Sequence, residues 1–255
     1  MANTDLRLDF CQAIAKQAGE LAVKMRQQSG SDFIANKGHQ DFVTAADHAV
    51  ERFIRERIEA EFPTEAIVGE EEGATGHSDT CWVIDPIDGT ANYMRGLPEW
   101  AISIACVQND RITHAVLDIP DIGRTASAQI GCGAFVNGQK LSVSATEVPV
   151  KSLIILGHSD RLPLQTHLST IDDLLSAGYE YRRQGSACFG LYSVAAGWAE
   201  AYHEMHLNPW DAFAGMLLIT EAGGTVTCKT VPEFLKSGSP FTATNGQIKL
   251  PMLDF

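Results

Sequence analysis

The chain lacks any long hydrophobic run and is poor in basic residues. No apolar stretch approaches the roughly 18 residues that a membrane-spanning helix needs. The N-terminus lacks the basic start and apolar core of a secretory signal. We therefore expect a cytoplasmic protein with no membrane partner. Lysine and arginine number 19 against 32 acidic residues, a formal net charge of −13. Because nucleic acids are bound through basic side chains, we expect no nucleic-acid partner.

The usual motifs of several enzyme classes are also missing. There is no GxSxG, HExxH, Walker loop or GxGxxG. The six cysteines contain no CxxC pair and no zinc-like Cys/His spacing, and most have apolar neighbours, so we expect buried free thiols. His203 and His206 lie three residues apart, but two histidines without further ligands are more often ordinary residues.

Apolar periodicity predicts a mixed α+β chain without strict βαβ alternation. Pro63 ends the second predicted helix, and Gly223 with Gly224 ends the last. Two halves are expected, residues 1–145 and residues 146–255. Helices are predicted over residues 9–28, 44–61, 187–197 and 212–222, and strands over 66–68, 82–84, 100–107, 112–117, 133–136, 141–143, 153–156 and 199–205.

The sharpest local feature is an apolar strand that ends in two carboxylates. Asp85 and Asp88 lie three apart and would face opposite sides of a regular strand. Pro86 is expected to interrupt the strand and Gly89 to permit a tight turn, so that both carboxylates converge. Hard oxygen ligands suit Mg²⁺ or Mn²⁺. An Asp-rich turn with capping roles is the alternative.

Three further segments carry acidic residues whose role is ambiguous on local grounds. Residues 70–72 are consecutive glutamates after an apolar run, which normally indicates a solvated loop, although sites gather at strand ends. Asp211 precedes the last predicted helix and could serve as its N-cap. Asp47 fits a loose capping box with Thr44. Nothing local makes Asp47 catalytic.

Together these segments resemble the inositol monophosphatase family of lithium-sensitive, metal-dependent phosphatases. The resemblance implies a layered αβαβα sandwich of the inositol monophosphatase and fructose-1,6-bisphosphatase type, a homodimer, and hydrolysis of a small phosphate monoester. The matching motifs occur in order over nearly the whole chain, at residues 37, 41–47, 69–71, 85–93, 185–187, 210–211 and 221–224.

The resemblance also implies a set of metal ligands. Glu70, Asp85 and the backbone carbonyl of Ile87 resemble the ligands of a first Mg²⁺. Asp85, Asp88 and Asp211 resemble those of a second. A third, weaker Mg²⁺ near Glu70 is typical of the family, and Mn²⁺ is a possible substitute.

Catalytic and phosphate-binding roles follow from the same resemblance. Asp47 and Thr90 resemble the pair that orients the attacking water, and Glu71 resembles a residue that supports it. The N–H groups of Gly89 and Thr90 are expected to bind the phosphate. This scheme agrees with metal activation of water and with the electrostatic character of phosphoryl transfer. No covalent phospho-enzyme is expected.

The substrate prediction depends mainly on Glu204. It matches the family glutamate that accepts hydrogen bonds from inositol hydroxyls, and Gly185, Ser186 and Ala187 match a segment that lines the same pocket. Inositol 1-phosphate is therefore the expected substrate. Histidinol phosphate is the alternative, because an acidic side chain could also bind an amine. Relatives also hydrolyse fructose 1,6-bisphosphate and phosphoadenosine phosphate.

Two other kinds of function remain open. One is a regulatory binding protein, because some bacterial relatives act on transcription complexes. The charge of −13 argues against direct nucleic-acid binding but not against a protein partner. The other is an inactive family member, which the intact set of carboxylates argues against.

Overall fold

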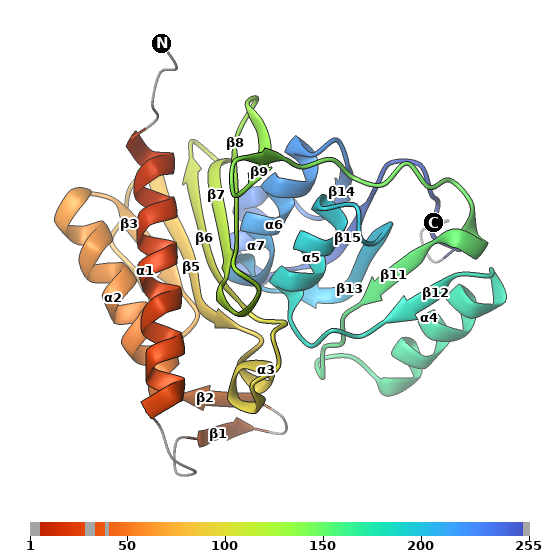
Figure 1. Cartoon of the computed structure of the whole chain (residues 1–255), viewed down its shortest axis with the longest axis horizontal. Helices are drawn as coiled ribbons and strands as arrows, with labels where there is room; N and C mark the ends of the chain where they lie inside the picture. Colours follow the sequence, from red (N-terminus) through yellow and green to blue (C-terminus); the bar gives the residue numbers. More distant parts are fainter. Residues whose placement is uncertain (1–5, 29–33, 39–40, 252–255) are drawn as a thin grey trace.

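The chain folds into five alternating layers (Figure 1). The computed structural model describes residues 6–28, 34–38 and 41–251, with backbone only for 34–38 and 41–44. Helices α1 (Leu6–Gln28) and α2 (Ala45–Glu61) cover one face of a large sheet. Helices α5 (Ala187–Ala195) and α6 (Pro209–Glu221) lie between that sheet and a smaller one, and α4 (Leu164–Ser176) lies outside. The predicted αβαβα sandwich is confirmed.

The large sheet has eight strands in the order β10-β9-β8-β7-β6-β5-β3-β4. Its strands pair antiparallel except for β3 and β5. Central strands such as β6 are buried along nearly their whole length because helices cover both faces. The strands are β3 (Ala66–Gly69), β4 (Gly73–Thr75), β5 (Thr80–Asp88), β6 (Ala101–Gln108), β7 (Arg111–Ile119), β8 (Arg124–Gln129), β9 (Gly133–Val136) and β10 (Gln139–Lys140).

The smaller sheet has five strands in the order β12-β11-β13-β15-β14. Strand β11 pairs parallel with both β12 and β13, so the carboxyl ends of these three strands lie at one edge. The strands are β11 (Leu153–Leu156), β12 (Glu180–Arg182), β13 (Ala201–Leu207), β14 (Thr225–Thr227) and β15 (Ser239–Thr244); the shorter elements are β1 (Ile34–Gly38), β2 (Asp41–Thr44), α3 (Thr90–Arg95), α7 (Val231–Ser237) and the 3₁₀ turns Pro120–Ile122 and Pro149–Lys151.

Small and branched side chains bring the layers together. Ala15, Ala18 and Ala22 of α1 are fully buried, which lets the helix backbone approach the sheet closely. In the central layer, Gly215 of α6 contacts Leu191 of α5 so closely that an added Cβ would lie 2.4 Å from the Leu191 Cβ. The helices that carry part of the candidate site are thus fixed in position by close packing.

Most predicted elements are confirmed, with ends shifted by a few residues. The strand predicted over 141–143 is wrong. This segment leaves the sheet after β10, and the N–H of Val143 donates to the carbonyl of Ala222 at the end of α6. Helix α4 was not predicted. Among the described residues, no helix combines the length and apolar character that crossing a lipid bilayer requires.

The cysteine prediction is confirmed in part. All six cysteines are free. Cys11, Cys106 and Cys188 are buried, whereas Cys132 is exposed because it lies in the turn between β8 and β9.

Candidate active site

A β-bulge brings Asp85 and Asp88 to the same face of β5. The strand was expected to break at Pro86, but it continues to Asp88. Asp85 pairs with Ser103 and Asp88 with Ala101, so β5 holds one residue more than β6 between these pairs. One extra residue reverses the alternation of side chains. Two carboxylates at a spacing that would normally separate them therefore converge.

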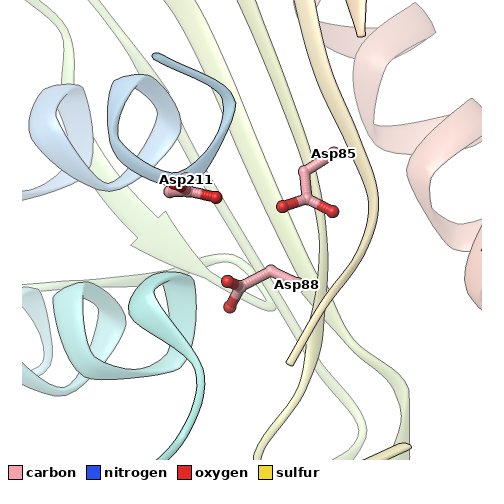
Figure 2. A group of neighbouring side chains, drawn as sticks. All are labelled: Asp85, Asp88 and Asp211. Carbon is pink, nitrogen blue, oxygen red and sulfur yellow. The ribbon is translucent and has the colours of Figure 1, made fainter. Parts of the chain in front are cut away.

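Asp211 reaches the same point from the first turn of α6. Asn208 is the N-cap, which makes the alternative of Asp211 as N-cap wrong. The Asp211 Oδ2 atom accepts hydrogen bonds from the Asn208 backbone N–H at 2.8 Å and from its side-chain amide at 3.1 Å. Asp85, Asp88 and Asp211 each place one oxygen within 4.8 Å of the others. Figure 2 shows the three side chains pointing toward one another.

Burial raises the pKa of all three carboxyl groups, and repulsion from neighbouring carboxylates adds to the shift at Asp85 and Asp211. Burial raises the pKa of Asp85 well above its usual value, and the charges of Glu70, Asp88 and Asp211 raise it further. Burial also raises the pKa of Asp88 to about 6, although hydrogen bonds from Ser186, Cys188 and Ala187 oppose the shift. The pKa of Asp211 rises to about 7 through burial and the charge of Asp88. Ionising the cluster is therefore unfavourable without a compensating cation.

The donor set fits a divalent metal. Within the described part of the chain, these three carboxylates accept hydrogen bonds only from neutral groups, and the charge of Arg161, which lines the adjoining pocket, lowers the pKa of Asp211. Buried carboxylates without a cationic side chain are costly unless a metal neutralises them. An all-oxygen, carboxylate-rich set is what Mg²⁺ or Mn²⁺ prefers.

Asp88 is held by the N-terminus of α5. Its carboxylate accepts hydrogen bonds from the Ser186 hydroxyl, from the Ala187 N–H at 3.2 Å and from the Cys188 N–H at 2.9 Å. The positive end of a helix dipole favours an ionised carboxylate there. Ser186 and Ala187, predicted to contact substrate, thus also orient a predicted metal ligand.

The glutamates that follow β3 form an ordered turn beside the three aspartates. Glu70 lies close enough to raise the pKa of Asp85. The Glu71 side chain is only 3% exposed, with an oxygen 4.0 Å from the Nε2 atom of His48. Glu72 is 40% exposed. The alternative of a wholly solvated acidic loop is wrong for Glu71 and holds better for Glu72.

A buried ion pair that the sequence did not reveal supports this turn. Glu51 of α2 accepts hydrogen bonds from the backbone N–H groups of Glu71 at 2.8 Å and Glu72 at 2.9 Å. Arg55 donates to Glu51 at 2.9 Å and to the carbonyl of Gly73 at 2.5 Å. An i,i+4 Glu–Arg pair usually indicates an exposed helix face, so local pattern gave no sign of this role.

Thr90 and Asp47 meet at the end of β5. The Thr90 hydroxyl lies 3.1 Å from Asp47 Oδ1 and 3.1 Å from the carbonyl oxygen of Ile87. Asp47 is fully buried in the first turn of α2. Gly89 precedes α3 with φ of 86°, and an added Cβ would lie 2.9 Å from the Ser186 Cβ. Only glycine suits both this backbone conformation and this close approach.

A pocket of about 250 Å³ opens beside the carboxylates. Glu204 lies in it and is only 8% exposed; its carboxyl group accepts a hydrogen bond from Tyr202 and lies against Gly157. Burial raises the pKa of Glu204 to about 8. Of the predicted residues, Asp88, Gly185, Ser186, Ala187, Glu204 and Asp211 line this pocket.

Some residues of the motifs that carry the family resemblance have side chains that the structure does not describe. This applies to Lys37 and to residues 41–44, including Thr44 as the predicted cap of α2. The remaining predicted site residues do not line the pocket but lie around the end of β5. They are Asp47, Glu70, Glu71, Asp85, Ile87, Gly89 and Thr90.

The family model for inositol monophosphatases matches residues 4–249. The chain belongs to the inositol monophosphatase family. This family comprises metal-dependent phosphatases that act on small phosphorylated substrates.

Relatives of two kinds are similar to this family member. It is 37% identical over 240 residues to "Nus factor SuhB" of Pseudomonas aeruginosa, covering 91% of this chain and 89% of the relative. It is 34% identical over 251 residues to human "Inositol monophosphatase 1", covering 94% and 90%. The crystal structure of the extragenic suppressor protein suhB from Bartonella henselae superposes with a TM-score of 0.87 at 28% identity, covering 95% of both chains.

Proposed function

We propose that this protein is a phosphoric monoester hydrolase that uses Mg²⁺ to release phosphate from inositol 1-phosphate or a similar polyol phosphate. The observation that carries the proposal is the cluster of Asp85, Asp88 and Asp211, of which the first two are buried and all three converge to within 4.8 Å. The cluster adjoins a pocket that contains Glu204. Family membership and the likeness to human inositol monophosphatase 1 support the same activity.

Two metal positions are proposed. Glu70, Asp85 and the Ile87 carbonyl would hold one ion, and Asp85, Asp88 and Asp211 a second; a third near Glu70 follows from the resemblance. When bound, such ions lower the pKa of water and neutralise phosphate charge. The shared Asp85 needs a fixed orientation, which the Ile87 N–H provides by donating to its Oδ1 atom at 3.0 Å.

Thr90 and Asp47 are proposed to orient the attacking water. The Thr90 hydroxyl donates to the buried Asp47 carboxylate, which leaves a hydroxyl lone pair to accept a hydrogen bond from the attacking water and so orient it. Glu71, held above the site by its backbone bond to Glu51, would support the same water. The N–H groups of Gly89 and Thr90 precede or begin α3 and would bind the phosphate oxygens.

The pocket favours a hydroxyl-bearing leaving group over an amine. Burial raises the pKa of Glu204 to about 8, which favours the neutral form of its carboxyl group. A neutral carboxyl group can donate to one hydroxyl and accept from another. Arg161 and Arg183 also line the pocket, and their charges oppose an ammonium group. Inositol 1-phosphate is therefore preferred to histidinol phosphate.

A phosphate-release panel tests the proposal. Inositol 1-phosphate, histidinol phosphate, fructose 1,6-bisphosphate and phosphoadenosine phosphate are offered with Mg²⁺, with chelator, and with added Li⁺. Turnover of inositol 1-phosphate should require Mg²⁺ and decrease with Li⁺. Asp88→Asn should reduce kcat by at least about a hundredfold because it removes a proposed metal ligand. Chelator-resistant activity, or wild-type turnover by folded Asp88→Asn, would exclude the mechanism.

A second function is proposed from the relatives called Nus factor SuhB. This chain would then also bind a protein partner, independently of catalysis. A cytoplasmic homodimer is proposed for the same chain on family grounds. Pull-down with wild-type and Asp88→Asn baits separates the two functions, since only binding unrelated to turnover survives the substitution. Sedimentation equilibrium measures the oligomeric state.

A further inference from the structure

A second pocket lies where helix α1 packs on strands β7 and β8. Figure 1 shows α1 lying across the face of the large sheet. The pocket has a volume of about 570 Å³ and is bordered by α1, β7, β8 and the turns beside these strands. A volume of this size is ordinary for a site that binds a small molecule. We name it the α1 pocket. It shares no lining residue with the pocket beside the three aspartates, so it calls for an explanation of its own.

Asp118 of β7 is a buried carboxylate that borders the α1 pocket. Its side chain is only 5% exposed. The Thr125 hydroxyl donates to its Oδ1 atom at 2.6 Å. Among the residues that the structure describes, no group donates a hydrogen bond to its Oδ2 atom. A buried carboxylate oxygen without a donor is unfavourable. Asp118 therefore offers an acceptor to a ligand in the pocket.

Gly19 of α1 leaves room for this carboxylate. An added Cβ at Gly19 would lie 2.4 Å from Asp118 Oδ2 and 2.7 Å from Pro120 Cγ. Glycine in the middle of a helix lowers its stability, and Gly19 lies well inside α1. The helix thus tolerates a residue that is unfavourable for it where the Asp118 carboxylate comes closest. The Oδ2 atom consequently lies next to the side chains that α1 presents to the pocket.

Charges of both signs border Asp118 on α1. Burial raises the pKa of Asp118 to about 6, while the charge of Lys16 lowers it and the charge of Glu20 raises it further, so both side chains lie near the carboxylate. Lys24 follows on the same face of the helix. Over the described ranges, none of these three exposed α1 side chains forms an ion pair. Opposite charges four residues apart normally indicate a solvated helix face, but this face covers a buried carboxylate.

This arrangement of charges fits a zwitterion better than a ligand with one charge. An amine at Asp118 would be repelled by Lys16 unless it also carried an anionic group. A carboxylate at Lys16 would be repelled by Asp118 and Glu20 unless it also carried a cationic group. Val23 and Pro120 add apolar surface to the same pocket. The complementary ligand has an ammonium group, a carboxylate and an apolar part.

We propose that the α1 pocket binds an α-amino acid with an apolar side chain. The ammonium group of the ligand would donate to Asp118 Oδ2, which is a charge-assisted hydrogen bond. The ligand carboxylate would face the Lys16 ammonium group, and the apolar side chain would lie on Val23 and Pro120. This binding site goes beyond the proposed phosphatase function and does not depend on it.

Leucine and two analogues that each lack one charge test the α1 pocket. L-Leucine, 3-methylbutylamine and 4-methylpentanoate are titrated separately into the ¹⁵N-labelled whole chain with Mg²⁺, and amide chemical shifts report binding. We expect leucine to shift the Gly123 and Thr125 amides saturably, with a Kd at least about tenfold below that of either analogue. Equal Kd values for the three compounds, or no saturable shift at these amides, would overturn the proposal. Phosphatase activity has no part in this measurement, so its failure leaves the result unaffected.

Two variants separate the charges of the pocket. Asp118→Asn keeps an oxygen for the Thr125 hydroxyl but should raise the leucine Kd about tenfold and lower that of 4-methylpentanoate, because repulsion of the carboxylate is removed. Lys16→Gln, at an exposed position where folding is not at risk, should raise the leucine Kd about threefold. Lys151→Gln, exposed and outside the pocket, is the matched control and should change nothing. An unchanged leucine Kd in folded Asp118→Asn or in Lys16→Gln would reject the site.

Discussion

At the scale of single residues, Asp85, Asp88 and Asp211 are poorly suited to the metal-free protein. Asp85 and Asp88 are buried and Asp211 is partly exposed; the charge of Asp88 raises the pKa of both Asp85 and Asp211, and the charge of Asp211 raises that of Asp85. Asp85 is the most affected, because Glu70 and Asp47 add their charges. Without a bound cation, the charges of these carboxylates lower the stability of the folded protein. A metal-binding function explains why such destabilising side chains are present.

Replacing Asp85 by Asn should therefore stabilise the metal-free protein. The amide keeps an oxygen to accept from the Ile87 N–H but carries no charge to be desolvated. We expect the Tm in excess chelator to rise by about 5 °C and the Mg²⁺-induced rise in Tm to disappear. Asp79→Asn, at an exposed loop position, should change neither. A lower Tm in chelator would show that Asp85 is not destabilising.

The Thr90 hydroxyl offers a test of the water-orienting pair. Thr90→Val keeps the shape but removes the bond to Asp47, whereas Thr90→Ser keeps the hydroxyl. Because positioned proton acceptors contribute about 10²-fold or more, kcat should fall by about that factor in the Val variant. The Ser variant should stay within about tenfold of wild type. Equal kcat values in the two variants would rule out a role for the hydroxyl.

The sequence predicted the role of a single residue only where a chemically suitable side chain also stood in a recognisable local pattern. Asp85 and Asp88 stood out because two acids directly follow an apolar strand. Glu51 did not, because a buried glutamate on a helix looks like any surface acid until the chain folds over it. Glu204 was assigned from its place in the motif, and only the structure shows it buried against Tyr202.

At the scale of elements, the turn between β3 and β4 depends on glycine for a steric reason. At Gly69 an added Cβ would lie 2.3 Å from Glu51 Oε1 and 2.8 Å from Arg55 Nη2. Gly73 is the reverse case, with φ of 70° and open space around an added Cβ. The first position forbids a side chain through crowding, and the second only disfavours one through backbone conformation.

Gly69→Ala and Gly73→Ala form a matched pair. Gly69→Ala should displace the buried Glu51–Arg55 pair and destabilise the protein by about 3 kcal/mol, the scale for breaking a buried ion pair. It should also weaken Mg²⁺ activation, because Glu51 orients the Glu70–Glu72 turn. Gly73→Ala should cost only about 1 kcal/mol. Urea unfolding and Mg²⁺ titration of activity measure both effects, and equal losses of stability would contradict the steric account.

Helices and strands were predictable where the spacing of apolar residues and the length of the segment both indicated the same type of element. Helices α1, α2 and α6 have a long apolar pattern, α2 and α6 also have clear stop signals, and all three predicted ranges agree with the structure to within three residues at each end. Short strands such as β12 and β14 have three residues and no pattern of their own. They exist through pairing with β11 and β15. The bulge in β5 likewise arises from register with β6, which local sequence does not encode.

At the scale of the whole molecule, the site lies where distant segments meet. Asp88 of the large sheet is bonded to Ser186 and Cys188 of the central helices, about 100 positions away in sequence. One hydrophobic core includes Val83 and Ala105 of the large sheet as well as Tyr202 and Phe241 of the smaller one. We propose that the halves 1–145 and 146–255 unfold together, since each supplies part of this core.

The raised pKa values predict how stability depends on pH. The pKa of Asp88 rises from 3.8 to about 6 and that of Asp211 from 3.8 to about 7. A group with a raised folded pKa binds protons more tightly in the folded state than in the unfolded state. Its stabilising contribution is thus complete below pH 3.8 and is lost as pH rises through 6 and 7. Without metal, stability should therefore fall by several kcal/mol between about pH 5 and pH 8.

Saturating Mg²⁺ should remove most of this decline, because a bound cation favours the ionised carboxylates that alkaline pH creates. The Tm difference between Mg²⁺ and chelator is expected to be small at pH 5 and largest at pH 8. Scanning calorimetry across this range measures it. The Asp88→Asn, Asp211→Asn double variant should show a shallower decline in chelator, since Asp85 and Glu204 keep raised pKa values, and no response to Mg²⁺. If the Tm of wild type changed with pH in the same way in Mg²⁺ and in chelator, these carboxylates would bind no metal.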